Sequence, residues 1–231
     1  MTSPRRTAPS HLDVLSQMHR LLEPRTYLEI GVSRGRSLAL STTRSIGVDP
    51  DFHVTVPIAC DLQLVRATSD DFFAAGDAVA HFAGTPVDLA FIDGLHLAEF
   101  AYRDFMNVER LCSAGSVILL DDMLPRNDEQ AARERTTRAW AGDVFKVADL
   151  LRRLRPDLTV LPVDTAPTGV VVVAGLDPSS TVLADAYGDV LAELQSPDPQ
   201  HVPPHVVERH GAVDVETLAG MPTWAELRLL R

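Results

Sequence analysis

Short, mainly apolar runs that each end at a glycine or an aspartate constrain the fold of this chain more than any other feature. The runs at 27–30, 46–48, 87–92 and 117–120 are followed by Gly31, Asp49, Asp93 and Asp121. The last run is apolar at every position, which is typical of a strand buried on both faces of a parallel sheet. Stretches of helical spacing separate the runs. This alternation predicts right-handed βαβ units and a doubly wound α/β fold.

The rest of the chain extends this pattern. We predict helices over 11–22, 101–112, 144–154 and 180–195, and a further helix that begins at 33–37. A third strand is expected at 64–67. The apolar segments 158–163 and 170–174 flank a short Pro/Gly turn, which predicts a hairpin. Such an antiparallel hairpin departs from a purely parallel dinucleotide-binding sheet.

The length of 231 residues suits one α/β domain with terminal extensions. We expect a polar, disordered segment over 1–10, the folded domain over 11–195, and a Pro-rich extension over 196–231. The extension is interpreted as an extended linker with a short terminal segment that docks on the domain or on a partner.

Charge and composition narrow the possible partners. The chain has 21 basic and 32 acidic residues, a formal net charge of −11, so it has no general attraction for nucleic acids or anionic membranes. No stretch approaches the roughly 20 apolar residues that span a bilayer, and no signal peptide is evident. Cys60 and Cys112 are too few for a disulfide framework. We expect a cytoplasmic protein with a small-molecule partner; a homo-oligomer is left open.

A glycine-rich motif after the first core strand indicates a ligand site. It reads E-x-G-x-x-x-G-x-S and is formed by Glu29, Gly31, Gly35 and Ser37, with Ser33 between the glycines. The glycines let the backbone approach a ligand, and free N–H groups at a helix start would face it. A dinucleotide fold would have G-x-G-x-x-G. Glu29 stands in place of the first glycine and suits a ligand ammonium group. The alternative is a glycine-rich turn without a ligand.

Acidic and polar residues after the next two strands add a nucleoside site. Asp49 follows Glu29 by 20 residues, at the end of the next strand, where an acid can accept both ribose hydroxyls. Pro50 and Phe52 would flank the base, and Ser69 and Asp70 would read the adenine edge. The alternative for Ser69–Asp70 is a helix N-cap. An ammonium-binding acid, a ribose-binding acid and an adenine rim together describe S-adenosylmethionine (SAM).

These motifs resemble those of the class I SAM-dependent methyltransferases. More narrowly, FIDGLHLAEFAYRDF, SVILLDDMLP and WAGDVFK, in this order, are similar to a small bacterial family related to macrocin O-methyltransferase and cephalosporin hydroxylase. The resemblance covers about residues 25–175. It implies a three-layer, Rossmann-like sheet of seven strands whose last strand is antiparallel. It also implies methylation of a small natural-product or sugar hydroxyl.

Three aspartates are expected to meet at the catalytic end of the sheet. Asp93 ends one core strand, and Asp121 and Asp122 end the next. Three adjacent carboxylates repel one another unless a cation lies between them, and their oxygens suit Mg²⁺ or another divalent ion. The set is similar to the Asp, Asp, Asn metal ligands of catechol-type O-methyltransferases. The alternative is a group of acidic loop caps without metal.

His96 is the candidate general base, with Asp93 beside it. It follows Asp93 by three residues, where catechol-type enzymes have a lysine. A neutral imidazole can remove the proton of an acceptor hydroxyl, because its ordinary pKa is near neutral pH. Alternatively, His96 orients the acceptor, supports a metal ligand, or caps a helix that begins near Leu97.

Two points of organisation and function stay open. The charged segment 126–138 is either a mobile lid or a solvated surface helix, and Trp140–Lys146 would start the helix beneath a lid. Alternatively, the chain is a SAM-fold protein that binds the cofactor or a partner and catalyses no reaction. A hydroxylase-like oxidoreductase is a third possibility, against which the missing G-x-G-x-x-G and two-His-one-carboxylate motifs speak.

Overall fold

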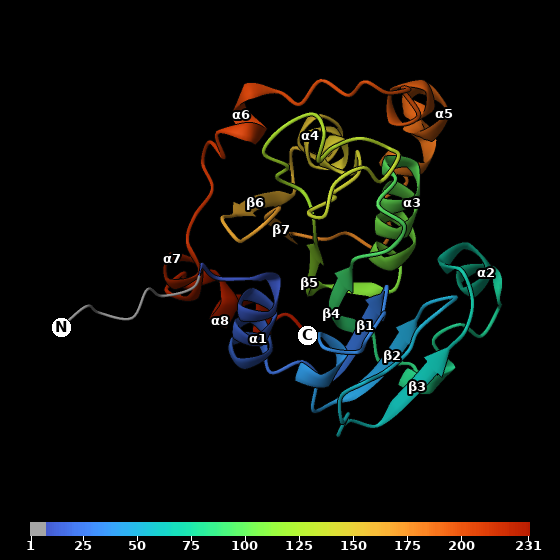
Figure 1. Cartoon of the computed structure of the whole chain (residues 1–231). Coiled ribbons are helices and arrows are strands. Elements are labelled where there is room, and N and C mark those ends of the chain that lie inside the picture. The colour runs from blue at the N-terminus through green and yellow to red at the C-terminus, as the bar shows by residue number, and fades with distance from the viewer. Residues whose placement is uncertain (1–7) are drawn as a thin grey trace.

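A computed structural model describes residues 8–231 and shows one seven-stranded sheet with helices on both faces (Figure 1). Residues 1–7 of the segment that we predict to be disordered lie outside the described residues. The strands are β1 (Thr26–Ile30), β2 (Arg44–Val48), β3 (Leu62–Val65), β4 (Val87–Ile92), β5 (Cys112–Leu120), β6 (Thr159–Val163) and β7 (Val170–Ala174). Their order is β3-β2-β1-β4-β5-β7-β6, and β7 is antiparallel to both neighbours. The predicted α/β methyltransferase-like sheet is confirmed.

The helices form two layers. One face carries α3 (Ala98–Glu109), α4 (Phe145–Leu154) and α5 (Val182–Leu194), and α2 (Ser69–Ala74) contacts α3. The opposite face carries α1 (His11–Leu22), α7 (Val215–Ala219) and α8 (Thr223–Arg228), which contact one another or β5. The short α6 (Pro204–Val207) lies in the segment that joins α5 to α7 (Figure 1). No helix among residues 8–231 is long and apolar enough to cross a bilayer.

The central strands are buried on both sides because their side chains alternate between the two layers. Leu28 and Ala90 belong to the cluster that α3, α4 and α5 cover, whereas Tyr27, Leu89 and Phe91 belong to the cluster on the α1 side. This is the period-two alternation of a strand. Fully burying each large apolar side chain contributes about 1.5–3 kcal/mol. The apolar pattern of the sequence therefore fixes the sheet and, with it, the edge at which the strands end.

The helix that we predict to begin at 33–37 is absent, and the residues form a turn followed by a 3₁₀ helix, η1 (Leu38–Leu40). Gly31, Ser33 and Gly35 all have positive φ, of 92°, 47° and 76°. A right-handed helix needs negative φ, so these residues cannot belong to one. Any ligand that approaches this motif meets backbone from a turn.

We predict that the C-terminal extension is an extended linker with a short terminal segment that docks on the domain or on a partner; its end does pack on the domain, but the extension also contains helices. It contains α6, α7 and α8, and Trp224 and Leu227 are buried in the cluster on the α1 side. Arg231 Nη1 donates to the carbonyl of Leu22 at 2.9 Å. The extension thus completes the helical layer on the α1 face of the sheet.

Candidate active site

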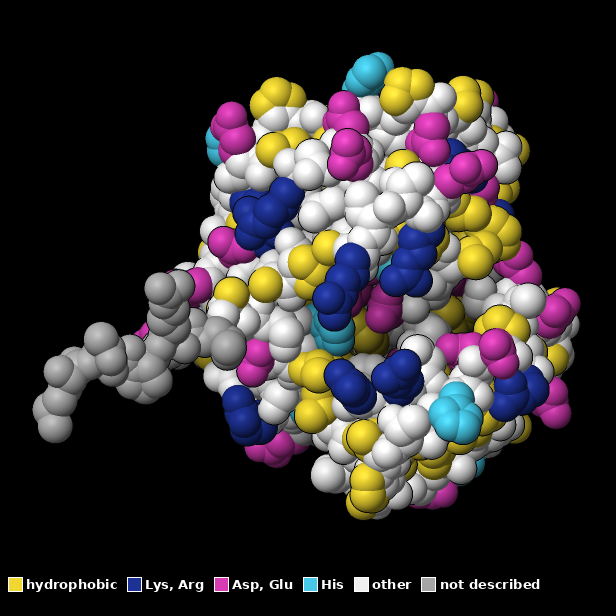
Figure 2. All heavy atoms as spheres, viewed as in Figure 1, with side chains coloured by type: hydrophobic (Ala, Val, Ile, Leu, Met, Phe, Trp, Pro, Cys, Tyr) yellow, Lys and Arg dark blue, Asp and Glu magenta, His cyan; other side chains and the backbone are white. Residues whose placement is uncertain are grey.

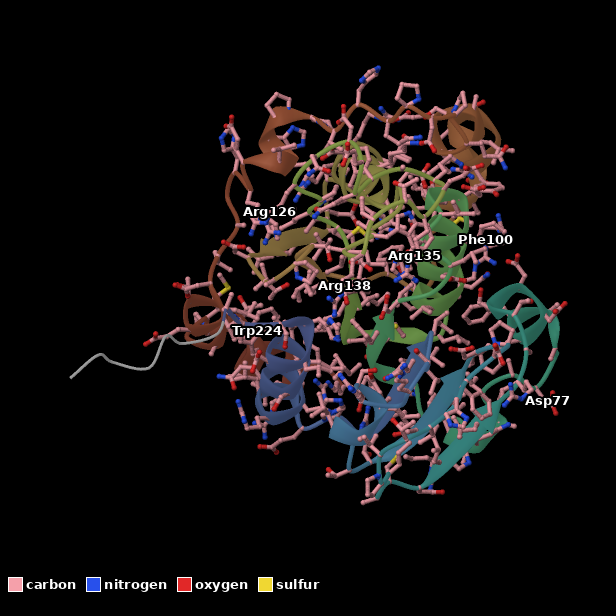
Figure 3. All side chains as sticks on the ribbon, viewed as in Figure 1. Asp77, Phe100, Arg126, Arg135, Arg138 and Trp224 are labelled. Atoms are coloured by element: carbon pink, nitrogen blue, oxygen red, sulfur yellow. The ribbon has the colours of Figure 1, made fainter. Side chains whose placement is uncertain are left out.

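A cavity of about 460 Å³ opens at the carboxyl ends of β1, β2 and β4. Residues from these strand ends form one wall, and α3 and the loop 126–140 form the other. This volume lies within the usual range of small-molecule sites, about 300–1,000 Å³. Figure 3 labels Phe100 on α3 and Arg135 on the loop, both of which line the cavity.

Gly31 lets β1 and β4 come together at the cavity floor. A Cβ at this position would lie 1.8 Å from the carbonyl oxygen of Asp93, and φ is 92°. No other residue type fits there without moving the end of β4. The sequence prediction that this glycine brings the backbone close to the site is consistent with its place in the cavity wall.

Asp49 holds the glycine-rich turn in place. Its Oδ2 accepts a hydrogen bond from the backbone N–H of Ser33 at 2.7 Å, and its Oδ1 accepts one from Asp51 N–H at 2.7 Å. Asp49 and Ser33 both line the cavity. Each carboxylate oxygen can accept a second hydrogen bond, so Asp49 can still bind a hydroxyl of a ligand.

Glu29 lies beneath the turn and not in the cavity wall, and its predicted contact with an ammonium group stays a prediction. It is fully buried, and its two oxygens accept hydrogen bonds from Tyr27 Oη at 2.5 Å and Ser37 Oγ at 2.7 Å. Burial raises the pKa of Glu29 to about 8, although both hydrogen bonds act in the opposite direction. The carboxyl group of Glu29 therefore supports Ser37 from below. Ser37 and Gly35 are buried too and shape the turn from behind.

Of the two residues after β3 that we predict to contact adenine, one lines the cavity and the other does not. Ser69 lines it, together with Thr68. Asp70 instead forms a two-pronged ion pair with Arg103 of α3, at 3.0 and 2.6 Å. The carboxylate of Asp70 thus joins α2 to α3, and its predicted adenine contact stays a prediction. The N-cap of α2 is Thr68, whose side chain accepts from Asp71 N–H.

His96 lies between two carboxylates at the end of β4. Its Nε2 is 3.1 Å from Asp93 Oδ1, and its Nδ1 is 3.2 Å from Asp122 Oδ2, although Nδ1 is not aligned for a hydrogen bond. Both His96 and Asp122 have positive φ, 61° and 62°. Such backbone is unusual away from glycine and tends to occur at functional sites.

Asp121 lines the same small cavity as Asp93, His96 and Asp122, but its carboxylate pairs with a histidine of α1 and not with this group. Its Oδ2 lies 2.9 Å from Nδ1 of His11, at the start of α1. The groups that do meet are Asp93, His96 and Asp122, whose ligand atoms all lie within 4.8 Å of one another. His11 is a neighbour of the site that the sequence analysis missed, because it comes from a helix 110 positions away along the chain.

Two histidines carry the positive charge in this acidic region. Burial alone lowers the pKa of His96, but its hydrogen bond to Asp93 and the charges of Asp122, Asp93 and Asp121 outweigh burial and raise the pKa to about 9. The pKa of His11 also rises to about 9, since Asp121 outweighs burial. Both rings are therefore imidazolium ions at neutral pH and offset Asp93 and Asp121, whereas burial and the charge of Asp121 raise the pKa of Asp122 to about 8.

Asp104 is a further acidic residue of the cavity that the sequence analysis missed. It lies on α3, is 2% exposed, and its Oδ1 has no hydrogen-bond partner in the fold. Burial raises the pKa of Asp104 to about 7. A signal was present in the sequence, because Asp104 falls within the apolar stripe of Ala101, Phe105 and Val108.

The loop 126–140 is irregular, so the predicted alternative of a surface helix is wrong. Arg133 ties the loop to the domain through ion pairs with Glu99 at 2.7 Å and Asp143 at 2.6 Å. Asp143 also accepts a hydrogen bond from Ala98 N–H, at the start of α3. Trp140, at the end of the loop, stacks on the His96 ring with centroids 4.8 Å apart.

The sheet order, the antiparallel β7 and the cavity at the strand ends define the class I methyltransferase fold. Residues 28–123 match a family model described as a methyltransferase domain. No curated protein matches the sequence.

Solved structures share the fold at low sequence identity. The O-methyltransferase TomG from Streptomyces achromogenes, in complex with SAM, is 18% identical with a TM-score of 0.53, covering 72% of this chain and 80% of TomG. A putative O-methyltransferase from Klebsiella pneumoniae is 17% identical with a TM-score of 0.50, covering 75% and 84%. Residues 28–123 thus match a methyltransferase domain, and the chain shares the fold of these O-methyltransferase structures. The narrower resemblance to the macrocin-related family stays a prediction.

Proposed function

We propose that this chain transfers the methyl group of SAM to a hydroxyl group of a small molecule. The observation that carries the proposal is the group of Asp93, His96 and Asp122 beside a cavity whose other end is formed by Gly31, Ser33 and Asp49. An acid–base group and a nucleoside-sized site adjoin one another. TomG, bound to SAM and named an O-methyltransferase, supports the same reading.

The strand ends would bind the cofactor. The proposal assigns the ribose hydroxyls to the free acceptor capacity of Asp49 and the adenine edge to Thr68 and Ser69. Backbone groups near Gly31 and Ser33, together with Asp93, would hold the methionine part of SAM. Glu29 and Ser37 would support the turn from beneath. When bound, SAM supplies an electrophilic methyl group on a leaving sulfonium.

The protein must then place a hydroxyl in line and accept its proton. We assign this proton to His96, whose ring is held by Asp93 on one side and by Trp140 on its face. Asp93 stabilises the imidazolium that forms. Because the pKa of His96 is raised to about 9, the neutral base is the minor form at pH 7.

The metal ion predicted from the sequence is the alternative source of positive charge at this site. Asp93, His96 and Asp122 could together hold a divalent ion, whereas Asp121 could not without leaving His11. Mg²⁺ prefers a shell of oxygen ligands, and here both nitrogens of an imidazole face the carboxylates. We therefore expect the imidazolium of His96 to supply the positive charge and derive no step through a metal.

Calorimetry with S-adenosylhomocysteine (SAH) and methyl transfer from labelled SAM test the proposal together. Wild type should bind SAH, and Asp49→Ala should weaken binding at least tenfold, about 1.4 kcal/mol. Labelled methyl should appear on an acceptor hydroxyl, and turnover should survive EDTA. SAH binding without any product would favour the binding-protein alternative. Loss of activity in EDTA with recovery in Mg²⁺ would restore the metal hypothesis, and no SAH binding would refute the site.

A further inference from the structure

Positive side chains gather around the cavity of a chain whose net charge is −11. Figure 2 shows Lys and Arg side chains on both sides of the central hollow, with acidic side chains within it. Lys146 is the one lysine of the sequence, and it is only 9% exposed, so this exposed charge comes from arginine.

Some arginines of the described residues have no acidic partner. Within residues 8–231, the arginines without an acidic oxygen within 4.0 Å are Arg20, Arg34, Arg36, Arg110, Arg135 and Arg138. Four of these six belong to the two segments that border the cavity. Arg34 and Arg36 are exposed on the turn that holds Ser33, and Arg135 and Arg138 are exposed on the loop 126–140 (Figure 3).

Unpaired arginines at a cavity favour an anionic ligand. The guanidinium group presents paired donors that match carboxylate and phosphate oxygens, and it is more weakly hydrated than an ammonium group. Bound SAM cannot satisfy them all, because it carries a single carboxylate and is a cation overall. The remaining positive charge is therefore available to the second substrate.

The loop side of the cavity also offers an apolar surface. Leu95 is 56% exposed and lines the cavity together with Phe100 and Trp140. Arg135 lies over the Trp140 ring, 5.9 Å from its centroid, and lines the same wall. An aromatic surface next to a guanidinium group suits a ligand that has a flat apolar body and a negative group at its edge.

We propose that the methyl acceptor is an anion: a hydroxyl-bearing molecule with an apolar body and a carboxylate or phosphate group that Arg135 and Arg138 hold. Its hydroxyl then points to His96, which the Trp140 ring covers. The inference rests on the proposed methyl transfer and adds the class of its acceptor.

Calorimetry on SAH-loaded protein tests the acceptor class with 4-hydroxybenzoate, 4-hydroxyphenyl phosphate and the neutral methyl 4-hydroxybenzoate. At least one anion should bind tenfold or more tightly than the neutral ester, and the preference should weaken as salt rises. Whether the carboxylate or the phosphate binds better distinguishes the two sources of charge.

The double variant Arg135→Gln/Arg138→Gln should remove this preference while SAH affinity stays within twofold. Arg110→Gln is the matched control, because Arg110 is also unpaired but follows the far end of α3, about 18 Å along the helix from its start. An ester that binds as tightly as the anions, or no binding of either anion to wild type, overturns the inference. Failure of SAH itself to bind would instead refute the proposed function.

Discussion

The two walls of the cavity are built in different ways. Gly31, Asp49 and Asp93 stand directly at the ends of β1, β2 and β4, so the hydrogen bonds of the sheet fix their positions. Arg135 and Trp140 stand on an irregular loop that side chains tie to the domain: Arg133 pairs with Glu99 and Asp143, and Asp198 accepts from the backbone N–H of Arg133. The strand-end wall therefore moves only with the sheet, whereas the loop wall can be released without unfolding it. We infer that a mutation in the first wall affects the cofactor, and one in the second affects the acceptor.

The largest effect should come from Gly31→Ala, which breaks the strand-end wall. The new Cβ would lie 1.8 Å from Asp93 O at a φ of 92°, so the ends of β1 and β4 must separate. We expect SAH binding to fall below detection by calorimetry while the far-UV circular dichroism stays that of a folded protein.

Gly76→Ala is the control for this substitution, since a Cβ there meets nothing within 4 Å and its φ is not positive. It should bind SAH as wild type does. Wild-type affinity in Gly31→Ala would show that this close approach does not shape the cofactor site.

His96 lies where the two walls meet, between Asp93 and Trp140, and the variant His96→Gln tests its role. The neutral imidazole is the base, so the wild-type kcat/KM should rise about tenfold per pH unit and level off near pH 9, the pKa to which the carboxylates raise His96 in the free enzyme. The variant should lose this rise, and its kcat should fall on the order of 10²- to 10⁴-fold with little change in SAH affinity.

His205→Gln provides the comparison, because His205 pairs with Asp149 on the surface and lies outside the cavity. Its pH–rate profile should match that of wild type. If His96→Gln keeps the same ionisation and a similar kcat, the proton goes elsewhere, and Asp93 becomes the candidate base.

The difference between the strand-end wall and the loop wall also explains which site residues could be predicted from the sequence. Strand ends are marked locally by an apolar run and the residue that stops it, which was enough to place Gly31, Asp49 and Asp93 at one edge. The orientation of a side chain is not marked in this way. Glu29 and Asp70 were assigned to the ligand, but Tyr27 and Arg103 engage their carboxylates away from the cavity.

Contacts between segments that are far apart in the sequence could not be predicted either, because no local pattern marks them. His11 meets Asp121, and Arg133 meets Glu99 34 positions away, only after the sheet has formed. The helix predicted after β1 failed on local grounds, because three positive φ angles within five residues outweigh helical spacing. The anchored loop was visible in the sequence only as a charged segment.

The smallest effect should come from Arg133→Met, which releases the loop wall alone. Glu99 and Asp143 are buried, and removing one partner of a buried ion pair costs about 3–5 kcal/mol. Lys146 still pairs with Asp143 at 2.7 Å, so we expect the free energy of unfolding to fall by less, about 2 kcal/mol. Arg153→Met is the matched control, since its pair with Glu193 is exposed and such pairs contribute about 0–1 kcal/mol. Trypsin should cut Arg133→Met faster than wild type at Arg135 and Arg138, while SAH affinity stays unchanged. If SAH affinity falls along with the loop, the two walls are coupled, and the division between a cofactor wall and an acceptor wall is wrong.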